Sequence, residues 1–447
     1  MDATEYGNCA FQGYTQLEEI TGKLQPESED CLNLNIWTPN VDNKKRSVMF
    51  WIHGGAFITG GGIAPMYDGS ALAQRGDVVV VTINYRLGAL GYLYIPGVTA
   101  NVGHLDQILA LKWVHDNIEL FGGDPENVTI FGESAGGYSV VALVAMPAAN
   151  GLFNRIIAQS APIIDSKVTK KPSKKLMRML GVEKGDINAL RMISPEKIIN
   201  AQNKLIAEDP TNLLAFRPLI DGATLPIHPL KAFQDGDCKD IEFMIGTNLE
   251  EAKLFTALDP EISKMNKAGG EKLLFGYLGR SGIDVAKSKA MVDIYKQARE
   301  GHFSIEPKEI MNALITDYIF RISTIRLLEA QSKHQSNTYN YLFTWPSPAF
   351  NGDLGACHAL EIPFVFNTLN DPAFEVFVGK SSDLNDISYK VMDAWIAFAR
   401  TGNPNCDSIP KWPSYDFEKR STMLMDHEFK AVEKFFEEER AAWDDII

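Results

Sequence analysis

Ser134 lies in a short segment that could make it a nucleophile. It is the centre of Gly132-Glu133-Ser134-Ala135-Gly136, which follows the apolar, strand-like run 128–131 and precedes a helical pattern of small residues. A strand, a sharp turn and a helix around G-x-S-x-G lift the serine hydroxyl above the edge of a sheet. Both glycines are expected to be required, because a side chain at either would clash across the strained turn. The segment therefore predicts nucleophilic catalysis through a covalent intermediate on Ser134.

A serine hydroxyl is a poor nucleophile at neutral pH, so Ser134 needs a histidine base and an acid that orients it. In chains with this turn, the acid and then the histidine follow the serine. His358 fits the base, because it lies in a loop of small residues after a late predicted strand. The loop after the strand 242–246 offers two acids, Glu250 and Glu251, and position alone leaves that choice open. The other histidines are expected to be structural or solvated, the first of them within a glycine-rich loop: His53, His104, His115, His228, His302, His334 and His427.

A second glycine-containing loop could supply hydrogen-bond donors to the reaction. Attack by Ser134 on a carbonyl carbon would leave a negative oxygen, which needs preset donors. Segment 51–57, WIHGGAF, follows a buried strand and holds two glycines, so its backbone can come close to a substrate. We predict that the N–H groups of Gly55, Ala56 and Ala135 form this oxyanion hole.

Strand–helix alternation predicts how these distant residues meet. Several segments are apolar on both faces, as central strands of a mostly parallel sheet are. The predicted strands are 31–37, 47–52, 77–84, 128–131, 155–159, 242–246, 339–344 and 422–425. Helical patterns at 105–121 and 384–401 separate strands, and two helical insertions interrupt the order at about 167–235 and 252–335. We predict an α/β protein of one domain, residues 1–447, with helical caps over the C-terminal edge of the sheet.

Composition and charge limit the partners and the compartment. The chain of 447 residues is 45% hydrophobic, enough for a large core, and its formal net charge is −14. That charge argues against nucleic acid or an anionic membrane as the main partner. No run of about 18 apolar residues is present, so no membrane helix is expected. The start, MDATEYGNCA, lacks signal-peptide character, so we expect a cytoplasmic protein if the chain is complete as given and a secreted one if an N-terminal segment has been removed.

Two further features predict no chemistry. The five cysteines lack metal-ligand spacing, so no metal site is predicted. One glycosylation sequon, Asn127-Val128-Thr129, lies in the strand that enters the Ser134 turn. Because glycans need exposed loops, we interpret this sequon as coincidental.

These segments match a known family nearly from end to end. The matching stretches are SEDCLNLNIW (28–37), WIHGGAF (51–57), NYRLGALGYL (84–93), NVGHLDQ (101–107), FGGDPENVTIFGESAGG (121–137), FRPLIDG (216–222), GTNLEEA (246–252), CHALEIPFVF (357–366), WIAFARTGNPN (395–405) and WPSY (412–415). Taken together they are highly specific. The chain resembles the type-B carboxylesterase and cholinesterase-like branch of the α/β-hydrolases.

The resemblance implies a function and a catalytic triad. It implies Ser134 as nucleophile, Glu251 as acid and His358 as base, since the catalytic glutamate of the family is the second of two adjacent acids. It also implies a serine carboxylesterase that works through an acyl-enzyme on a small-molecule ester, without a cofactor. We expect the rate to fall below roughly pH 6 as His358 takes a proton. Two alternatives are an amidase or carbamate hydrolase with the same triad, and a non-catalytic cholinesterase-like binding protein. The presence of all three triad residues argues against the second.

The chain departs from the family pattern near its start. The family's usual N-terminal strands are not matched, so the sheet is expected to lack them. Cys9 and Cys31 match the first disulfide of the family, which implies that they are paired. The loop between them holds Phe11 and Tyr14 but no tryptophan. Because cholinesterase-like sites bind quaternary ammonium on a tryptophan there, its absence counts against choline esters.

Two smaller departures from the family lie elsewhere in the chain. Ala252 replaces the glycine that usually follows the catalytic glutamate, and His104 replaces a common leucine.

The walls of the substrate pocket are expected among large apolar residues near the predicted loops and insertions. A place in the core is the simpler interpretation for any one of these residues. The candidates are Phe57, Leu254, Phe255, Phe275 and Phe320.

Overall fold

A single mixed sheet organises the protein. The computed structural model describes residues 3–13, 24, 26–162, 167–183, 185–257, 259, 262, 267–280 and 283–446. Within these residues the sheet has nine strands in the order β1-β3-β2-β4-β5-β6-β7-β8-β9. Only the outermost strands, β1 and β9, pair antiparallel with their neighbours. The strands are β1 Leu34–Trp37, β2 Arg46–Ile52, β3 Val79–Ile83, β4 Gly123–Glu133, β5 Arg155–Gln159, β6 Glu242–Asn248, β7 Thr338–Phe343, β8 Thr422–Met425 and β9 Lys430–Val432. The predicted α/β class with a mostly parallel sheet is confirmed.

Helices cover both faces of the sheet, which explains why its central strands are apolar throughout. Alternate residues of β2 belong to two different cores: Val48 and Phe50 to one, Met49 and Trp51 to the other. The first core includes residues of α4 (Val102–Asn117), α5 (Ala135–Val144), α8 (Pro195–Glu208), α9 (Pro229–Asp235) and α15 (Ile322–Gln331). The second includes residues of α2 (Ser70–Gly76), α16 (Ile362–Phe366) and α18 (Leu384–Thr401).

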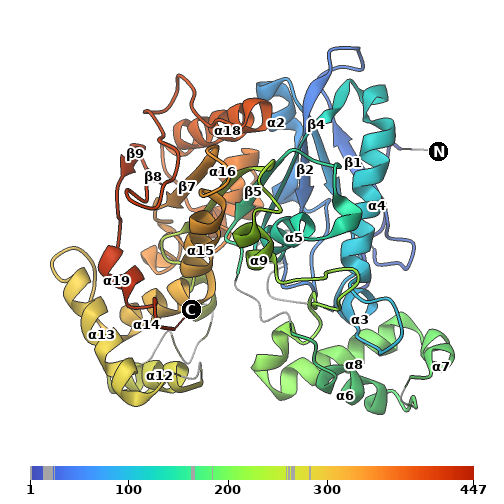
Figure 1. Ribbon diagram of the computed structural model, residues 1–447, viewed down its shortest axis with the longest axis horizontal. Helices are drawn as coiled ribbons and strands as arrows, with labels where there is room; N and C mark the ends of the chain where they lie inside the picture. The colour runs from blue at the N-terminus through green and yellow to red at the C-terminus, as the bar shows by residue number, and fades with distance from the viewer. Residues whose placement is uncertain are drawn as a thin grey trace.

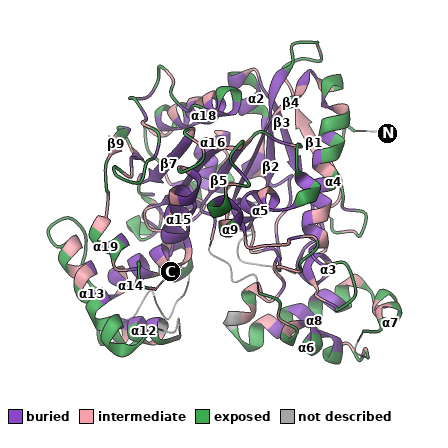
Figure 2. Cartoon of the chain, viewed as in Figure 1, coloured by how far each residue is buried: buried purple, intermediate pink, exposed green. Residues whose placement is uncertain are grey.

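Two groups of helices extend from one end of the sheet (Figure 1). Between β5 and β6 the described chain adds α6 (Lys171–Met179), α7 (Ile187–Arg191), α8 and α9. Between β6 and β7 it adds α10 (Lys253–Ala257), α12 (Lys267–Arg280), α13 (Val285–Arg299), α14 (Pro307–Thr316), the π-helical turn η5 (Asp317–Arg321) and α15. The second group has a small core of its own, which also includes Trp443 near the C-terminus. Figure 2 shows the central strands buried, whereas α6, α7, α12 and α13 expose much of their surface. The division into one domain stays a prediction.

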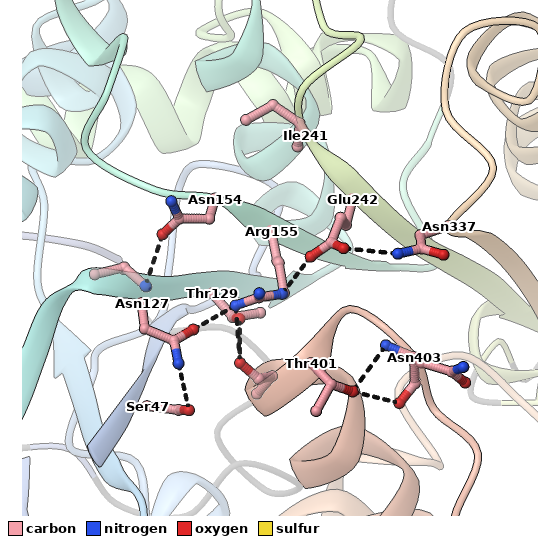
Figure 3. Close-up of polar contacts among 12 residues, drawn as sticks. Ser47, Asn127, Thr129, Asn154, Arg155, Ile241, Glu242, Asn337, Thr401 and Asn403 are labelled. Carbon is pink, nitrogen blue, oxygen red and sulfur yellow. Dashed lines mark hydrogen bonds and ion pairs between the residues drawn. The ribbon is translucent and has the colours of Figure 1, made fainter. Parts of the chain in front are cut away.

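The opposite end of the sheet is held by a polar network around Arg155 (Figure 3). The Arg155 Nε lies 2.5 Å from a carboxylate oxygen of Glu242, and the Asn337 amide donates to the same carboxylate at 2.7 Å. Arg155 also donates to the Asn127 side chain, whose own amide nitrogen donates to Ser47 Oγ at 2.9 Å. The amide nitrogen that a glycan would modify is therefore used within the fold, in keeping with the interpretation of the sequon as coincidental.

The predicted disulfide is not present. Cys9 and Cys31 are buried thiols that no disulfide joins. The Cys9 sulfur lies next to Gly61, and Cys31 belongs to the first core. Burial raises the pKa of the Cys31 thiol to about 11, which keeps it protonated. Residues 14–23, which include Tyr14, lie outside the described residues.

No helix within the described ranges is both long enough and apolar enough to cross a bilayer.

Candidate active site

Ser134 sits on a strained turn between β4 and α5. Its backbone has φ 56° and ψ −119°, an arrangement that a non-glycine residue adopts only when the surroundings enforce it. A Cβ atom at Gly132 would lie 2.5 Å from the carbonyl oxygen of Ile52, and one at Gly136 would lie 2.0 Å from it. The Ser134 N–H donates to the Gln159 carbonyl at 2.9 Å, which ties the turn to β5. The expectation that both glycines are required is confirmed.

Glu251 orients His358 through a short contact. The His358 Nδ1 lies 2.6 Å from Glu251 Oε2, although the two residues follow different strands. The other oxygen, Oε1, accepts from Ser160 Oγ at 2.6 Å and from the backbone N–H of Asn248 at 2.7 Å. Glu251 is fully buried, so these donors hold its carboxylate in one orientation.

The neighbouring acid, Glu250, is engaged elsewhere. It forms an ion pair with Lys253 at 2.7 Å and accepts from the Ala356 N–H at 3.0 Å. The contact expected of the orienting acid is therefore made by Glu251, as the family resemblance implied.

The second ring nitrogen of His358 faces the turn that carries Ser134. Its Nε2 lies 3.0 Å from Oε1 of Glu133, the residue next to Ser134. A Cβ atom at Gly54 would lie 2.8 Å from Glu133 Oε2 and 3.2 Å from Ser134 Cβ, so both side chains border the same narrow space. Within the described residues no hydrogen bond joins the Ser134 hydroxyl to His358. Apo structures often have loose catalytic hydrogen bonds that tighten with substrate.

Buried carboxylates control the charge of His358. Burial alone would lower the pKa of the imidazole, but Glu133 and Glu251 together raise that pKa well above its usual value. Burial raises the pKa of Glu133, and His358 offsets only part of this increase. We therefore expect His358 to gain its proton at a higher pH than an ordinary histidine does. Among the described residues, no set of three metal-ligating side chains is arranged to hold a metal ion.

A further buried acid, Glu361, lies behind the triad. It accepts from Gln159 Nε2 at 3.0 Å and from Asn248 Nδ2 at 2.6 Å, and Asn248 in turn contacts Glu251. Burial raises the pKa of Glu361 to about 7. No role was predicted for Glu133 or Glu361 from the sequence. A role could have been suspected because each acid interrupts a motif of apolar or small residues, GESAG for Glu133 and CHALEIPFVF for Glu361.

The predicted oxyanion loop has an unusual backbone. Gly55, Ala56 and Phe57 have φ values of 101°, 53° and 63°. Positive φ at a non-glycine residue is uncommon, and two in succession indicate a loop held for a purpose. Within the described residues, no acceptor is recorded for the N–H groups of Gly55, Ala56 and Ala135. These N–H groups therefore remain available to a ligand.

The predicted pocket residues lie in three different places. Phe320 and Phe255 flank His358, with ring centroids 4.7 and 5.4 Å from the imidazole. By contrast, Phe57 and Leu254 are buried members of the two cores, so the simpler interpretation holds for them. Phe275 lies 40% exposed on α12.

A cavity of about 400 Å³ lies elsewhere, between the segments 63–71 and 366–371. None of the predicted site residues lines it. It therefore gives no support to any of the predicted pocket residues.

Comparison with known proteins agrees with this geometry. A family model described as the carboxylesterase family matches residues 1–443. The chain is 37% identical over 438 residues to para-nitrobenzyl esterase of Bacillus subtilis (strain 168), covering 96% of this chain and 85% of that one. It is 36% identical over 443 residues to phenmedipham hydrolase of Pseudarthrobacter oxydans, with the same coverage.

Solved structures give the same result. A PNB esterase structure superposes with a TM-score of 0.85 and 35% identity, covering 99% of this chain and 89% of that chain. The Geobacillus stearothermophilus carboxylesterase Est55 at pH 6.2 gives the same TM-score, identity and coverage. The fold is therefore the α/β-hydrolase fold, and the activity is carboxylic-ester hydrolysis by a serine hydrolase. The chain belongs to the carboxylesterase family.

Proposed function

We propose that Ser134, His358 and Glu251 are the nucleophile, the base and the orienting acid of this esterase. The observation that carries the proposal is the position of the His358 ring. One nitrogen contacts Glu251 and the other faces the turn that carries Ser134. The N–H groups of Gly55, Ala56 and Ala135 are the proposed oxyanion hole.

The proposed reaction is a two-step acyl transfer. The His358 Nε2 leaves Glu133 and accepts the Ser134 proton as Ser134 Oγ bonds to the ester carbonyl carbon. The carbonyl oxygen becomes an oxyanion that the loop N–H groups stabilise, each by roughly 2.7–4 kcal/mol. The ester C–O bond then breaks, and the alcohol leaves with the proton from His358. Water repeats the two steps, releases the acid and restores Ser134.

The names of the relatives suggest which small molecules to test first. Para-nitrobenzyl esterase is a relative over 96% of this chain, which favours a para-nitrobenzyl ester as a substrate. Phenmedipham hydrolase is a relative over the same share, which makes phenmedipham hydrolysis the second candidate. The net charge of −14 favours a small ester over nucleic acid as the partner.

A substrate panel tests the proposed specificity. It contains p-nitrophenyl esters of graded acyl length, the matching p-nitroanilides, a para-nitrobenzyl ester and phenmedipham. We expect kcat/KM to be highest for an ester and to pass through an optimum with acyl length, because the aromatic rings beside His358 limit the space. Anilides are expected to react more slowly, since the amine must be protonated as it leaves. A higher kcat/KM for the anilides, or for phenmedipham, would reassign the natural reaction to amide or phenmedipham hydrolysis.

Glu133→Gln is expected to move the acid limb of the pH–rate profile to lower pH. Catalysis needs neutral His358, so kcat/KM rises as pH increases through the pKa of His358. Glu133 is one of two carboxylates that raise this pKa, and glutamine keeps the shape without the charge. Removing the charge therefore lowers the pKa, and the variant retains relatively more activity at low pH. The measurement is kcat/KM for one p-nitrophenyl ester between about pH 5 and 9.

Glu126→Gln serves as the matched control for this profile. Glu126 lies on the same strand as Glu133 but is exposed, so the loss of its charge should leave the midpoint of the acid limb unchanged. An unchanged or higher midpoint in Glu133→Gln would show that Glu133 does not set the charge of His358.

A further inference from the structure

Arg299, Arg321 and Glu439 form a buried charge cluster that the proposed reaction does not use. Glu439, on α19 (Glu437–Ala441), is fully buried. Its two oxygens accept from Arg299 at 2.7 and 3.1 Å, and Arg321 donates to it at 3.3 Å. The Phe436 ring lies beneath both guanidinium groups, at 5.2 and 5.1 Å. The cluster thus joins three elements: α13, η5 and the C-terminal helix α19.

Within this cluster, Arg321 closes the π-helical turn η5 on itself. Its Nε donates to Asp317 Oδ1 at 2.5 Å, four residues earlier in the chain. The Tyr295 hydroxyl donates to the other oxygen of Asp317, and Trp443 Nε1 donates to the Tyr295 oxygen at 2.7 Å. All of these side chains are buried. A π-helical turn is rare and occurs frequently at functional sites, so the contacts that hold η5 point to a role for this turn in function.

The other side of η5 faces the triad. The Phe320 ring packs on the His358 ring with a centroid distance of 4.7 Å and an interplanar angle of 36°. Thr316, just before the turn, accepts with Oγ1 from the N–H of Ala252, the residue after Glu251. Just after the turn, the Ser323 hydroxyl lies 3.0 Å from the carbonyl oxygen of Ala161. The turn is therefore fixed on one side by buried charges and touches the base and the acid loop on the other.

We propose that Arg299, Arg321 and Glu439 form a positioning device that holds Phe320 against His358 and so sets the geometry of the base. The inference rests on the proposed role of His358. If the charges were unbalanced, the π turn could relax to a regular helix, which rotates a residue by about 100° per position. Phe320 would then leave the imidazole. Burying several charges is costly, and apolar replacements often serve stability as well, so stability alone explains this cluster poorly.

A double-mutant cycle tests the device. Glu439→Gln and Phe320→Leu are made singly and together in the full chain, and kcat/KM is measured for a short and a long p-nitrophenyl ester. We expect Glu439→Gln to lower kcat/KM about tenfold in the parent, because the base is displaced. In the Phe320→Leu background the same change should cost less than about twofold, because the contact that transmits it is already lost. Equal losses in both backgrounds would overturn the proposal.

Two further variants keep the test decisive. Arg440→Gln removes a buried charge from the same helix, but Arg440 pairs with Glu437 and Asp444 rather than with η5. This control should lower the melting temperature without lowering kcat/KM for either ester. If Glu439→Gln fails to fold, Arg299→Gln replaces it in the cycle, since it also leaves the buried charges unbalanced while the glutamine amide can still donate to Glu439. No turnover in the parent would refute the proposed function, whereas turnover with additive losses would refute only the positioning device.

Discussion

Ser134→Ala is expected to lower kcat for a p-nitrophenyl ester by roughly 10⁴- to 10⁶-fold while the protein stays folded. The loss is large because the proposed covalent step has no other acceptor for the acyl group. The fold should persist, because alanine fits the same turn and the N–H that donates to Gln159 is kept. The measurement combines initial rates with a thermal melt. A serine-directed fluorophosphonate should add its mass to the parent and not to the variant.

Ser139→Ala is the matched control, because Ser139 lies on α5, the helix that begins directly after Ser134. Its hydroxyl donates to the Ala135 carbonyl at 2.9 Å and is fully buried. The control should lose about 1 kcal/mol of stability and keep most of its activity. If Ser134→Ala kept more than about a hundredth of the parental kcat, Ser134 would not be the nucleophile.

The parallel strands could be predicted because both of their faces are buried. The runs 155–159 and 422–425 coincide with β5 and β8, and the strand before Ser134 runs into the turn as expected. Strand β9, Lys430–Val432, was missed because three residues that are exposed or half-buried leave no hydrophobic pattern. The turn itself was predictable from the G-x-S-x-G pattern between a strand and a helix, although the carbonyl that demands glycine there belongs to Ile52 on the neighbouring strand β2.

The environment of the triad was less predictable, because it depends on side chains that meet only in the folded chain. The pairing of Glu251 rather than Glu250 with His358 came from the family resemblance, since adjacent acids look alike in sequence. The position of Glu133 against the imidazole depends on how β4 enters the turn. Phe57 is buried in the first core, on a loop with three successive positive φ values at 55–57, and such a backbone leaves no hydrophobic pattern in the sequence. The implied disulfide came from the resemblance alone, because a buried thiol and a paired cysteine look alike in sequence.

Glu251→Gln is expected to lower kcat by about 10⁴-fold, and the hydrogen bonds around Glu251 give the reason. Its Oε1 accepts from Ser160 and from the Asn248 N–H, so a glutamine must place its oxygen there. The amide nitrogen then faces His358 Nδ1, which has to accept instead of donate. His358 carries its proton on Nε2 in that tautomer and cannot take one from Ser134.

The measurement for Glu251→Gln is single-turnover acylation by a p-nitrophenyl ester, which isolates the step that needs the base. Glu250→Gln is the control, because the neighbouring acid pairs with Lys253 and not with the imidazole. A much slower acylation in Glu251→Gln, with little change in Glu250→Gln, would assign the role of orienting acid to Glu251. Comparable rates for Glu251→Gln and the parent would mean that the contact at 2.6 Å does not select the tautomer, and the proposed base would lose its support.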